Sequence, residues 1–206
     1  MHDDARVEFF NGIAGDWDGW EDMDRLRAGL DDGLREFGVG PGETVADIGC
    51  GTGNLTRAIL DRLSGEGRVV AVDFSPGMIA VARRKIPDAR VSWNVADARR
   101  LPVGDARCDR VFCLGVWPHF DDPAAVAREV FRVLRPGGLL HVWHLASRER
   151  INQIHAGKGG AIGRDLLAPA GDTAAVLESV GFRIEAVEDT ERRYLVTARR
   201  PQEQPG

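Results

Sequence analysis

The chain has 206 residues, a length that suits one domain with a substantial core. Apolar residues make up 43% and charged residues 29%, as in ordinary globular proteins, and the formal net charge is −5 at pH 7. Acidic and basic residues are interspersed, which predicts no basic face and no nucleic acid partner. The polar start of the chain and the lack of a long apolar run predict neither signal peptide nor membrane span, so a cytoplasmic location is expected.

The three cysteines exclude two common classes of small protein. Cys50, Cys108 and Cys113 are an odd number without a CxxC spacing, which argues against a disulfide framework and against a zinc ribbon. We expect Cys50 to fill a tight loop and the other two to be core thiols.

Strand-like and helix-like runs alternate after a partly helical, amphipathic stretch of 40 residues. In chain order, the expected elements are strand 44–48, helix 54–64, strand 68–73, helix 75–86, strands 91–95 and 108–115, helix 123–134, strand 139–145, helices 147–156 and 172–180, and strands 183–189 and 193–199. A stop-and-turn signal, Arg135-Pro136-Gly137-Gly138, separates the third of these helices from the strand that follows it.

This order predicts an α/β fold with a Rossmann-like, doubly wound sheet. The sheet has seven strands, mostly parallel, with helices on both faces. The last two strands form an antiparallel hairpin because their connection is too short for a crossover. We expect a single domain over residues 1–200, with a helical lid at 1–40, an insertion near the substrate site at 147–171, and a disordered tail at 201–206.

A glycine-rich loop, Gly49-x-Gly51-x-Gly53, follows the first expected strand, where ligands bind in open parallel sheets. Its spacing differs from the GxGxxG of dinucleotide folds, and it lacks the Lys-Ser/Thr ending of a P-loop. Asp73 ends the second strand and can accept from ribose hydroxyls. Asp97 ends the third and can accept from an adenine amine. The pattern predicts an adenosyl ligand without phosphate.

Four segments, in this order, resemble the motifs of class I S-adenosylmethionine-dependent methyltransferases. They are 45–53, 71–78, 94–98 with the following Leu101-Pro102, and 133–138. The resemblance covers about residues 5–200, and in detail the chain is similar to the small-molecule branch that includes ubiquinone and menaquinone methyltransferases. It implies S-adenosyl-L-methionine as cofactor and a small molecule as methyl acceptor.

The resemblance also implies roles for single residues around the cofactor. The three glycines of the loop would line the methionine part, with Asp47 nearby, and Asp73 would hold the ribose. The other implied contacts are Phe74 and Met78 beside the adenine, Asp97 and Ala98 at its edge, and the Leu114 backbone at the amino group.

Candidate residues for the methyl acceptor follow the fourth and fifth strands and lie in the N-terminal segment. Methyl transfer needs a positioned nucleophile and, for some acceptors, a base. The candidate bases are His119, His144 and His155. The candidate substrate contacts are Trp17, Trp117, Arg148 and Asn152, of which the last two share a helical face with His155 by their spacing.

Other interpretations remain open at this point. The chain could be a non-catalytic S-adenosylmethionine-binding regulatory or accessory protein, or a metal-assisted methyltransferase that uses His119, His144 and His155. No HExxH or comparable metal-binding spacing is present, so no resident metal is expected. A short-chain dehydrogenase is disfavoured because the GxGxxG and TyrxxxLys patterns are missing. The sequence allows a monomer or a homodimer and does not name the acceptor or the atom methylated.

Overall fold

The computed structural model describes residues 4–20 and 22–202. Their contacts group into two compact units, Met1–Ala98 and Arg99–Gly206. Part of the predicted lid (residues 1–3 and 21) and most of the predicted tail (203–206) lie outside the described residues. Within the described ranges, no helix has both the length and the apolar character that crossing a bilayer requires.

The first unit is built on three parallel strands in the spatial order β3-β2-β1. Their bounds agree with the expected ranges: β1 (Thr44–Ile48), β2 (Arg68–Asp73) and β3 (Val91–Val95). Four of the five β1 residues are buried, which is the pattern of a strand covered on both faces. The carboxyl ends of β1 and β2 therefore lie side by side and carry the glycine loop and Asp73.

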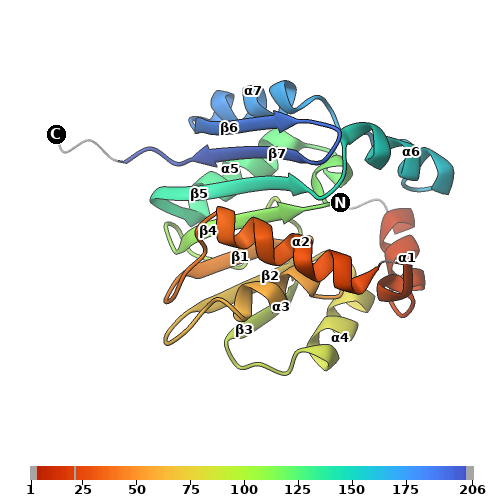
Figure 1. The fold of residues 1–206 in the computed structure, drawn as a ribbon, viewed down its shortest axis with the longest axis horizontal. Helices are drawn as coiled ribbons and strands as arrows, with labels where there is room; N and C mark the ends of the chain where they lie inside the picture. Colours follow the sequence, from red (N-terminus) through yellow and green to blue (C-terminus); the bar gives the residue numbers. More distant parts are fainter. Residues whose placement is uncertain (1–3, 21, 203–206) are drawn as a thin grey trace. The chain divides into compact units, whose positions relative to one another are not determined.

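Two helices of the first unit, α2 and α4, begin at side-chain caps. The helical elements are α1 (Asp4–Ile13), the 3₁₀ segment η1 (Trp17–Trp20), α2 (Met23–Glu36), α3 (Asn54–Leu60) and α4 (Pro76–Lys85) (Figure 1). At the start of α4 the Ser75 hydroxyl accepts from the Met78 amide at 3.1 Å, and Pro76 follows the cap as expected. Helix α3 is shorter than the expected 54–64, because the amides of Arg62 and Leu63 both donate to Ile59 and the chain turns there.

The second unit combines a parallel strand pair with the antiparallel hairpin. Its strands, in the spatial order β4-β5-β7-β6, are β4 (Cys108–Leu114), β5 (Leu134–His144), β7 (Tyr194–Arg199) and β6 (Arg183–Asp189). Strand β4 pairs with β5 in parallel, whereas β7 is antiparallel to both neighbours. The described residues thus contain seven strands in total, with the C-terminal hairpin that the sequence predicts (Figure 1).

Helices of the second unit also lie close to their expected positions. They are the 3₁₀ turn η2 (Trp117–His119), α5 (Pro123–Val133), α6 (Arg148–Lys158) and α7 (Ala170–Val180). Helix α6 begins at Ser147, whose hydroxyl accepts from the Arg150 amide at 3.2 Å. Helix α7 packs on β6 and β7 and ends at Gly181, which adopts a left-handed conformation.

One expected turn is wrong. Residues 135–138 belong to β5, which begins at Leu134 and not at 139. Leu134 pairs with Cys108 and Leu139 pairs with Arg110, so the extra residues bulge from the ladder. The Gly137 amide in the bulge donates to the carbonyl of Arg200 at 2.8 Å, so a residue near the end of the chain supplies its hydrogen-bond partner. Sequence analysis alone could not include that distant partner.

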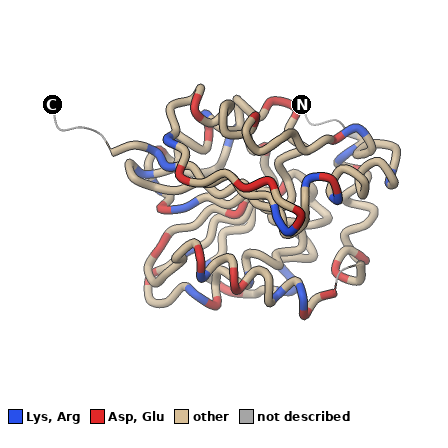
Figure 2. The backbone as a smooth tube through the Cα atoms, turned by 45° about the horizontal axis from the view of Figure 1, so that its top comes forward, with Lys and Arg blue, Asp and Glu red and all other residues tan. Residues whose placement is uncertain are grey.

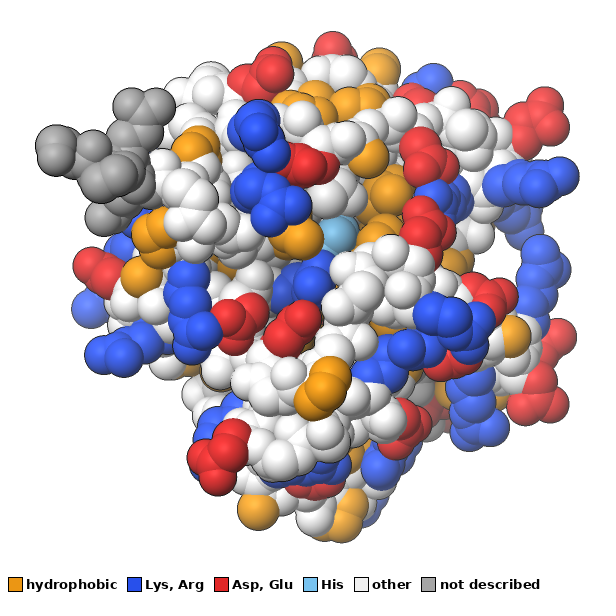
Figure 3. All heavy atoms as spheres, turned by 60° about the vertical axis from the view of Figure 1, so that its left-hand side comes forward, with side chains coloured by type: hydrophobic (Ala, Val, Ile, Leu, Met, Phe, Trp, Pro, Cys, Tyr) orange, Lys and Arg blue, Asp and Glu red, His pale blue; other side chains and the backbone are white. Residues whose placement is uncertain are grey.

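Charged side chains of both signs are interspersed along the chain (Figure 2). The face seen in Figure 3 has the same mixture, with apolar side chains in small groups between the charges. Arginines are often paired: Arg132 contacts Glu129 and Asp105, each at 2.6 Å. Such pairing keeps the field of the arginines local.

Candidate functional site

Hydrogen bonds join the glycine loop to Asp73. The Gly51 amide donates to Oδ2 of Asp73 at 2.9 Å, and the Ser75 amide donates to Oδ1 at 2.8 Å. The Asp73 residue is only 7% exposed, so these two N–H groups fix the carboxylate at the end of β2. A carboxylate oxygen can accept more than one hydrogen bond, so these two contacts are compatible with Asp73 as an acceptor of ribose hydroxyls.

The glycines of the loop serve different purposes. Gly49, Gly51 and Gly53 all have positive φ angles, of 72°, 52° and 86°. A Cβ atom built on Gly53 would lie 2.9 Å from Cη2 of Trp93 and 3.0 Å from Cδ1 of Ile86, so this glycine is required by packing. A Cβ atom built on Gly51 meets nothing within 4 Å. The loop thus leaves open space at Gly51, as a site for a bound methionine moiety needs.

Asp47 lies beneath the loop and is 1% exposed. The Thr56 hydroxyl donates to its Oδ2 at 2.6 Å and connects the end of β1 to the first turn of α3. Burial raises the pKa of Asp47 to about 7, and the charge of Asp73 adds to this effect, whereas the Thr56 hydrogen bonds oppose it. Asp47 therefore supports the loop from inside.

The residues assigned to the adenine differ in exposure. Phe74 is half-buried and packs edge-on against Phe10, with ring centroids 5.5 Å apart. Asp97 is half-buried, but Met78 and Ala98 are buried in the core of the unit. The amide of the residue before Asp97 donates to the carbonyl of Asp73 at 3.1 Å, which keeps the chain after β3 beside the end of β2.

A polar network ties the N-terminal segment to the loop region, and sequence analysis missed it. Asp18 of η1 accepts from the Thr52 hydroxyl at 2.6 Å and from the side-chain Nδ2 of Asn54 at 2.9 Å, and it pairs with Lys85 at 2.7 Å. Partial burial raises the pKa of Asp18, but the hydrogen bonds from Lys85, Thr52 and Asn54 outweigh it and hold that pKa below its usual value. The neighbouring Trp17 is half-buried and lies 6.1 Å from the Phe10 ring centroid.

In the second unit, two of the three candidate histidines meet at Asp165. Nδ1 of His119 lies 2.7 Å from Oδ2 of Asp165, and Nδ1 of His155 lies 2.5 Å from its backbone carbonyl oxygen. The two imidazole centroids are 4.9 Å apart. Asp165 was not predicted, because a single acidic residue in the glycine-rich stretch after α6 has no motif around it.

His144, the third candidate, is 1% exposed. Neither of its ring nitrogens has a hydrogen-bond partner in the described part of the chain. Its ring packs edge-on against Tyr194 at 5.5 Å. Burial, with a smaller contribution from the nearby His119 and His155, lowers the pKa of His144 to about 3, so the ring is neutral at physiological pH.

The candidate substrate contacts of the second unit already have partners. Trp117 is 4% exposed. The Arg148 guanidinium pairs with Asp189 at 2.9 Å and with Glu149 at 2.8 Å. The Asn152 side chain donates to the Leu167 carbonyl at 3.1 Å and accepts from the Leu167 amide at 2.8 Å. Arg148 and Asn152 hold the hairpin and the loop after α6, and a substrate would have to share these groups. Leu114 ends β4 and is half-buried.

The metal-assisted alternative gains no support. In the ranges that the structure describes, no three His, Cys, Asp or Glu side chains are arranged to hold a metal ion. Asp165 already engages the Nδ1 atoms of both His119 and His155. The three cysteines are buried free thiols, as predicted.

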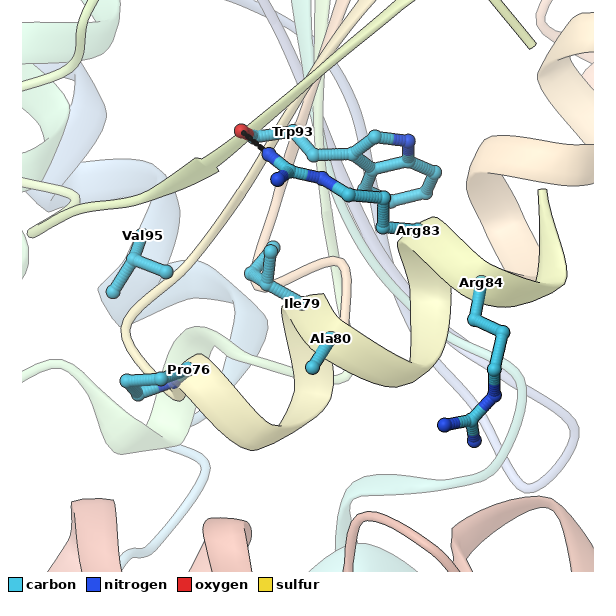
Figure 4. Close-up of a pocket in the computed structure, with 7 residues that line it drawn as sticks. All are labelled: Pro76, Ile79, Ala80, Arg83, Arg84, Trp93 and Val95. Atoms are coloured by element: carbon cyan, nitrogen blue, oxygen red, sulfur yellow. Dashed lines mark hydrogen bonds between the residues drawn. The ribbon is translucent and has the colours of Figure 1, made fainter. Parts of the chain in front are cut away.

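A pocket also lies between α4 and β3, apart from the predicted cofactor residues. It is lined by Pro76, Ile79, Ala80, Arg83, Arg84, Trp93 and Val95 (Figure 4). The Arg83 guanidinium, one of its polar groups, donates to the Trp93 carbonyl at 3.2 Å. None of the predicted site residues lines this pocket, so it contributes nothing to the assignment of the cofactor.

Comparison with known proteins agrees with this geometry. Residues 46–142 match the family model of a methyltransferase domain. It is 36% identical over 154 residues to malonyl-[acyl-carrier protein] O-methyltransferase of Hahella chejuensis, covering 74% of this chain and 55% of that protein. It is 37% identical over 148 residues to the ubiquinone/menaquinone biosynthesis C-methyltransferase of Ectopseudomonas mendocina, covering 66% and 56%. The chain thus spans about half the length of these curated relatives.

Solved structures extend the likeness beyond the methyltransferase domain. A SAM dependent methyltransferase from Aquifex aeolicus superimposes with a TM-score of 0.70 at 22% identity, covering 87% of this chain and 99% of that chain. The predicted resemblance to class I methyltransferases and the Rossmann-like, seven-strand fold are confirmed. The expected cofactor of a domain of this kind, S-adenosyl-L-methionine, is confirmed with them.

Proposed function

We propose that this chain is an enzyme that transfers the methyl group of S-adenosyl-L-methionine to a small molecule. The observation that supports the proposal most is the hydrogen bond from the Gly51 amide to Asp73, because it joins the carboxylate proposed to bind the ribose to a loop with open space at Gly51. When bound, the cofactor supplies an electrophilic methyl group on a sulfonium. The relatives include an O- and a C-methyltransferase, so they support the reaction type without fixing the atom methylated.

The cofactor residues of the proposal are those of the sequence prediction. Asp73 binds the ribose, and the loop glycines bind the methionine part above Asp47. Phe74 and Met78 flank the adenine, and Asp97 with the Ala98 backbone binds its edge. The backbone of Leu114 stays a proposed contact of the amino group.

For the acceptor, the proposal assigns proton transfer to the histidine group of the second unit. His119, His144 and His155 are the catalytic candidates, since a methyl acceptor often has to lose a proton. The proposed substrate contacts are Trp17, Trp117, Arg148 and Asn152. The small-molecule acceptor, the cytoplasmic location and the monomeric or homodimeric state belong to the proposal as well, and light scattering of the purified chain tests the last of these.

Calorimetry tests the cofactor assignment. The full chain is titrated with S-adenosylmethionine, S-adenosylhomocysteine and NAD. We expect binding of the first two only, and Asp73→Asn and Asp97→Asn should each weaken it about tenfold or more, because each removes a charged hydrogen-bond acceptor. Asp16→Asn, an exposed change in the same unit, is the matched control. Preference for NAD would reject the cofactor assignment.

A product scan tests the transfer itself. The chain is incubated with S-adenosylmethionine carrying a labelled methyl group and with fractionated small-molecule extracts. We expect label in one small-molecule fraction and formation of S-adenosylhomocysteine in equal amount. Tight binding of the cofactor without any labelled product would favour the non-catalytic binding protein instead.

A further inference from the structure

Helix α1 packs against the start of α4, just after Asp73, the proposed ribose acceptor. The Oδ1 atom of Asn11 in α1 accepts two hydrogen bonds, from the hydroxyl of Ser75 and from the amide of Gly77, each at 2.8 Å. A backbone N–H can only donate, so the atom that it meets is the carbonyl oxygen of the Asn11 side chain. Helix α1 thus supplies an acceptor to the segment that follows β2.

The two hydrogen bonds to Asn11 complete the cap of α4. The first amides of a helix have no partner within the helix, and Pro76 at its start has no amide hydrogen. The Ser75 hydroxyl accepts from the Met78 amide at 3.1 Å, and Asn11 accepts from the Gly77 amide. Ser75 is fully buried and donates its one hydroxyl proton to Asn11, so the rotation of this hydroxyl is fixed.

Gly77 allows the two helices to approach closely. A Cβ atom built there would lie 2.9 Å from Oδ1 and 3.0 Å from Cα of Asn11, although the backbone of Gly77 does not adopt a positive φ. The glycine is therefore required by the contact with α1. One residue earlier in α1, Phe10 packs edge-on against Phe74, with ring centroids 5.5 Å apart. Neighbouring residues of α1 thus hold neighbouring residues of the segment after Asp73.

The backbone of Ser75 connects this contact to the Asp73 carboxylate. The Ser75 amide donates to Oδ1 of Asp73 at 2.8 Å, and the Gly51 amide donates to Oδ2 at 2.9 Å. The glycine loop therefore orients one oxygen, and a residue that α1 holds in place orients the other. A shift of Ser75 would turn the carboxylate, and hydrogen bonds to a ribose would weaken because they depend steeply on angle.

We infer that Asn11 is a positioning residue of the cofactor site, which fixes Ser75 and through it the Asp73 carboxylate, and so couples the docking of α1 to the binding of the ribose. The inference rests on the proposed binding of S-adenosyl-L-methionine and deepens it. Such coupling is reciprocal: the factor by which docked α1 raises the affinity for the cofactor is the factor by which the cofactor favours docked α1. Release of α1 from α4 therefore lowers the affinity for the ribose.

Calorimetry with two ligands tests the positioning. The full chain and Asn11→Leu, which loses the acceptor at similar size, are titrated with S-adenosylhomocysteine and with its 2′,3′-dideoxy analogue. We expect Asn11→Leu to bind S-adenosylhomocysteine about three- to tenfold more weakly, the effect of about one net hydrogen bond, and the analogue within about twofold of the wild type. A general loss of structure would weaken both ligands equally. Glu8→Leu, a matched change at an exposed residue of α1, should bind both like the wild type.

Gly77→Ala displaces α1 without removing the Asn11 acceptor. The added methyl group meets Asn11, so the two helices must separate, and we expect the same loss for S-adenosylhomocysteine with little change for the analogue. Gly12→Ala is the matched control, because nothing lies within 4 Å of its Cβ position.

Deuterium exchange measures the reciprocal effect. Saturating S-adenosylhomocysteine should slow exchange of the amides of residues 9–13 several-fold in the wild type, because the bound ribose favours docked α1. In Asn11→Leu, at equal saturation, this protection should be mostly lost, whereas Glu8→Leu should keep it.

The outcomes separate this inference from the proposed function. The role of Asn11 is overturned by wild-type affinity for S-adenosylhomocysteine in Asn11→Leu or Gly77→Ala, by an equal loss for both ligands, or by protection of α1 that Asn11→Leu retains. Each of these results leaves cofactor binding by the wild type in place. A wild-type chain that does not bind S-adenosylhomocysteine defeats the proposed function, and the inference with it.

Discussion

At Gly53, two independent constraints exclude a side chain. Its φ angle is +86°, and a Cβ atom would meet Trp93 at 2.9 Å and Ile86 at 3.0 Å. We therefore expect Gly53→Ala to lower the free energy of unfolding by about 2–4 kcal/mol, the sum of left-handed strain and overpacking. Gly12→Ala is the control, because Gly12 lies in α1 with nothing within 4 Å of its Cβ position, and it should be neutral or slightly stabilising. Urea unfolding of both variants measures the difference, and equal stabilities would contradict the packing argument.

The buried carboxyl of Asp47 makes stability depend on pH. Its pKa in the folded chain is about 7, against an ordinary value of 3.8, so the folded state binds this proton more tightly than the unfolded state. Its contribution is complete below about pH 4 and is lost as the pH rises toward 7, at up to about 1.4 kcal/mol per pH unit. Relative to Asp47→Asn, the wild type should therefore lose stability between pH 4 and 7.

Urea unfolding from pH 4 to 8, without cofactor, checks this dependence. Asp61→Asn, which changes an exposed carboxyl at the end of α3, serves as the control and should follow the wild type. If the Asp47→Asn curve runs parallel to that of the wild type, the carboxyl ionises as in the unfolded chain and burial has not raised its pKa.

At the scale of single residues, sequence analysis identified motif residues and missed their partners. Asp73 follows a buried strand and could be recognised from that position alone. Asp18 and Asp165 could not, because their importance comes from contacts with Lys85 and His119, which are 67 and 46 residues away in sequence. Such contacts depend on how loops fold back, which no local pattern records.

Among the elements, the segment η1 depends on the Asp18 network for its attachment to the loop region. Asp18→Asn removes the charge that pairs with Lys85. It also replaces one acceptor oxygen by an NH2 group, a donor, at a place where the neighbouring groups are donors too. We therefore expect the free energy of unfolding to fall by about 1 kcal/mol. The amides of 17–20 should exchange with deuterium several-fold faster, since local opening becomes easier. Asp16→Asn, two residues earlier, keeps the network and provides the comparison. Unchanged exchange at 17–20 in Asp18→Asn would show that the aromatic contacts alone hold η1.

Strands were predictable where short apolar runs end at glycine or aspartate, and β1, β2, β3 and β6 have the expected bounds. The expectation was wrong at 135–138, where local turn residues form a bulge in β5 because Gly137 pairs with Arg200. Helix α3 ended early for a different reason, a local turn at Ile59. The spacing of apolar residues shows which residues are buried. It therefore predicts the position of an element better than the residues at which the element ends.

For the whole molecule, the expectation of a single domain and the proposed cofactor lead to one joint prediction. Two compact units could unfold separately or together, and a single domain over 1–200 predicts one cooperative transition in calorimetry. S-adenosylmethionine at about 100 times its dissociation constant stabilises the state that binds it by about 2.7 kcal/mol. For a chain of this size the melting temperature should then rise by roughly 5–10 °C.

The way in which the cofactor shifts the melting curve distinguishes a single cooperative domain from two units that unfold separately. In a single domain the whole transition moves, and both units gain the stabilisation because neither unfolds alone. If Asp97→Asn weakens binding about tenfold, it should reduce the shift to about half, because the stabilisation depends on the logarithm of the affinity. Asp16→Asn should keep the full shift. Two transitions, of which the cofactor moves one, would contradict the single domain and would assign the cofactor to the unit that moves. A single transition that S-adenosylmethionine leaves in place would contradict binding itself, whatever the number of domains.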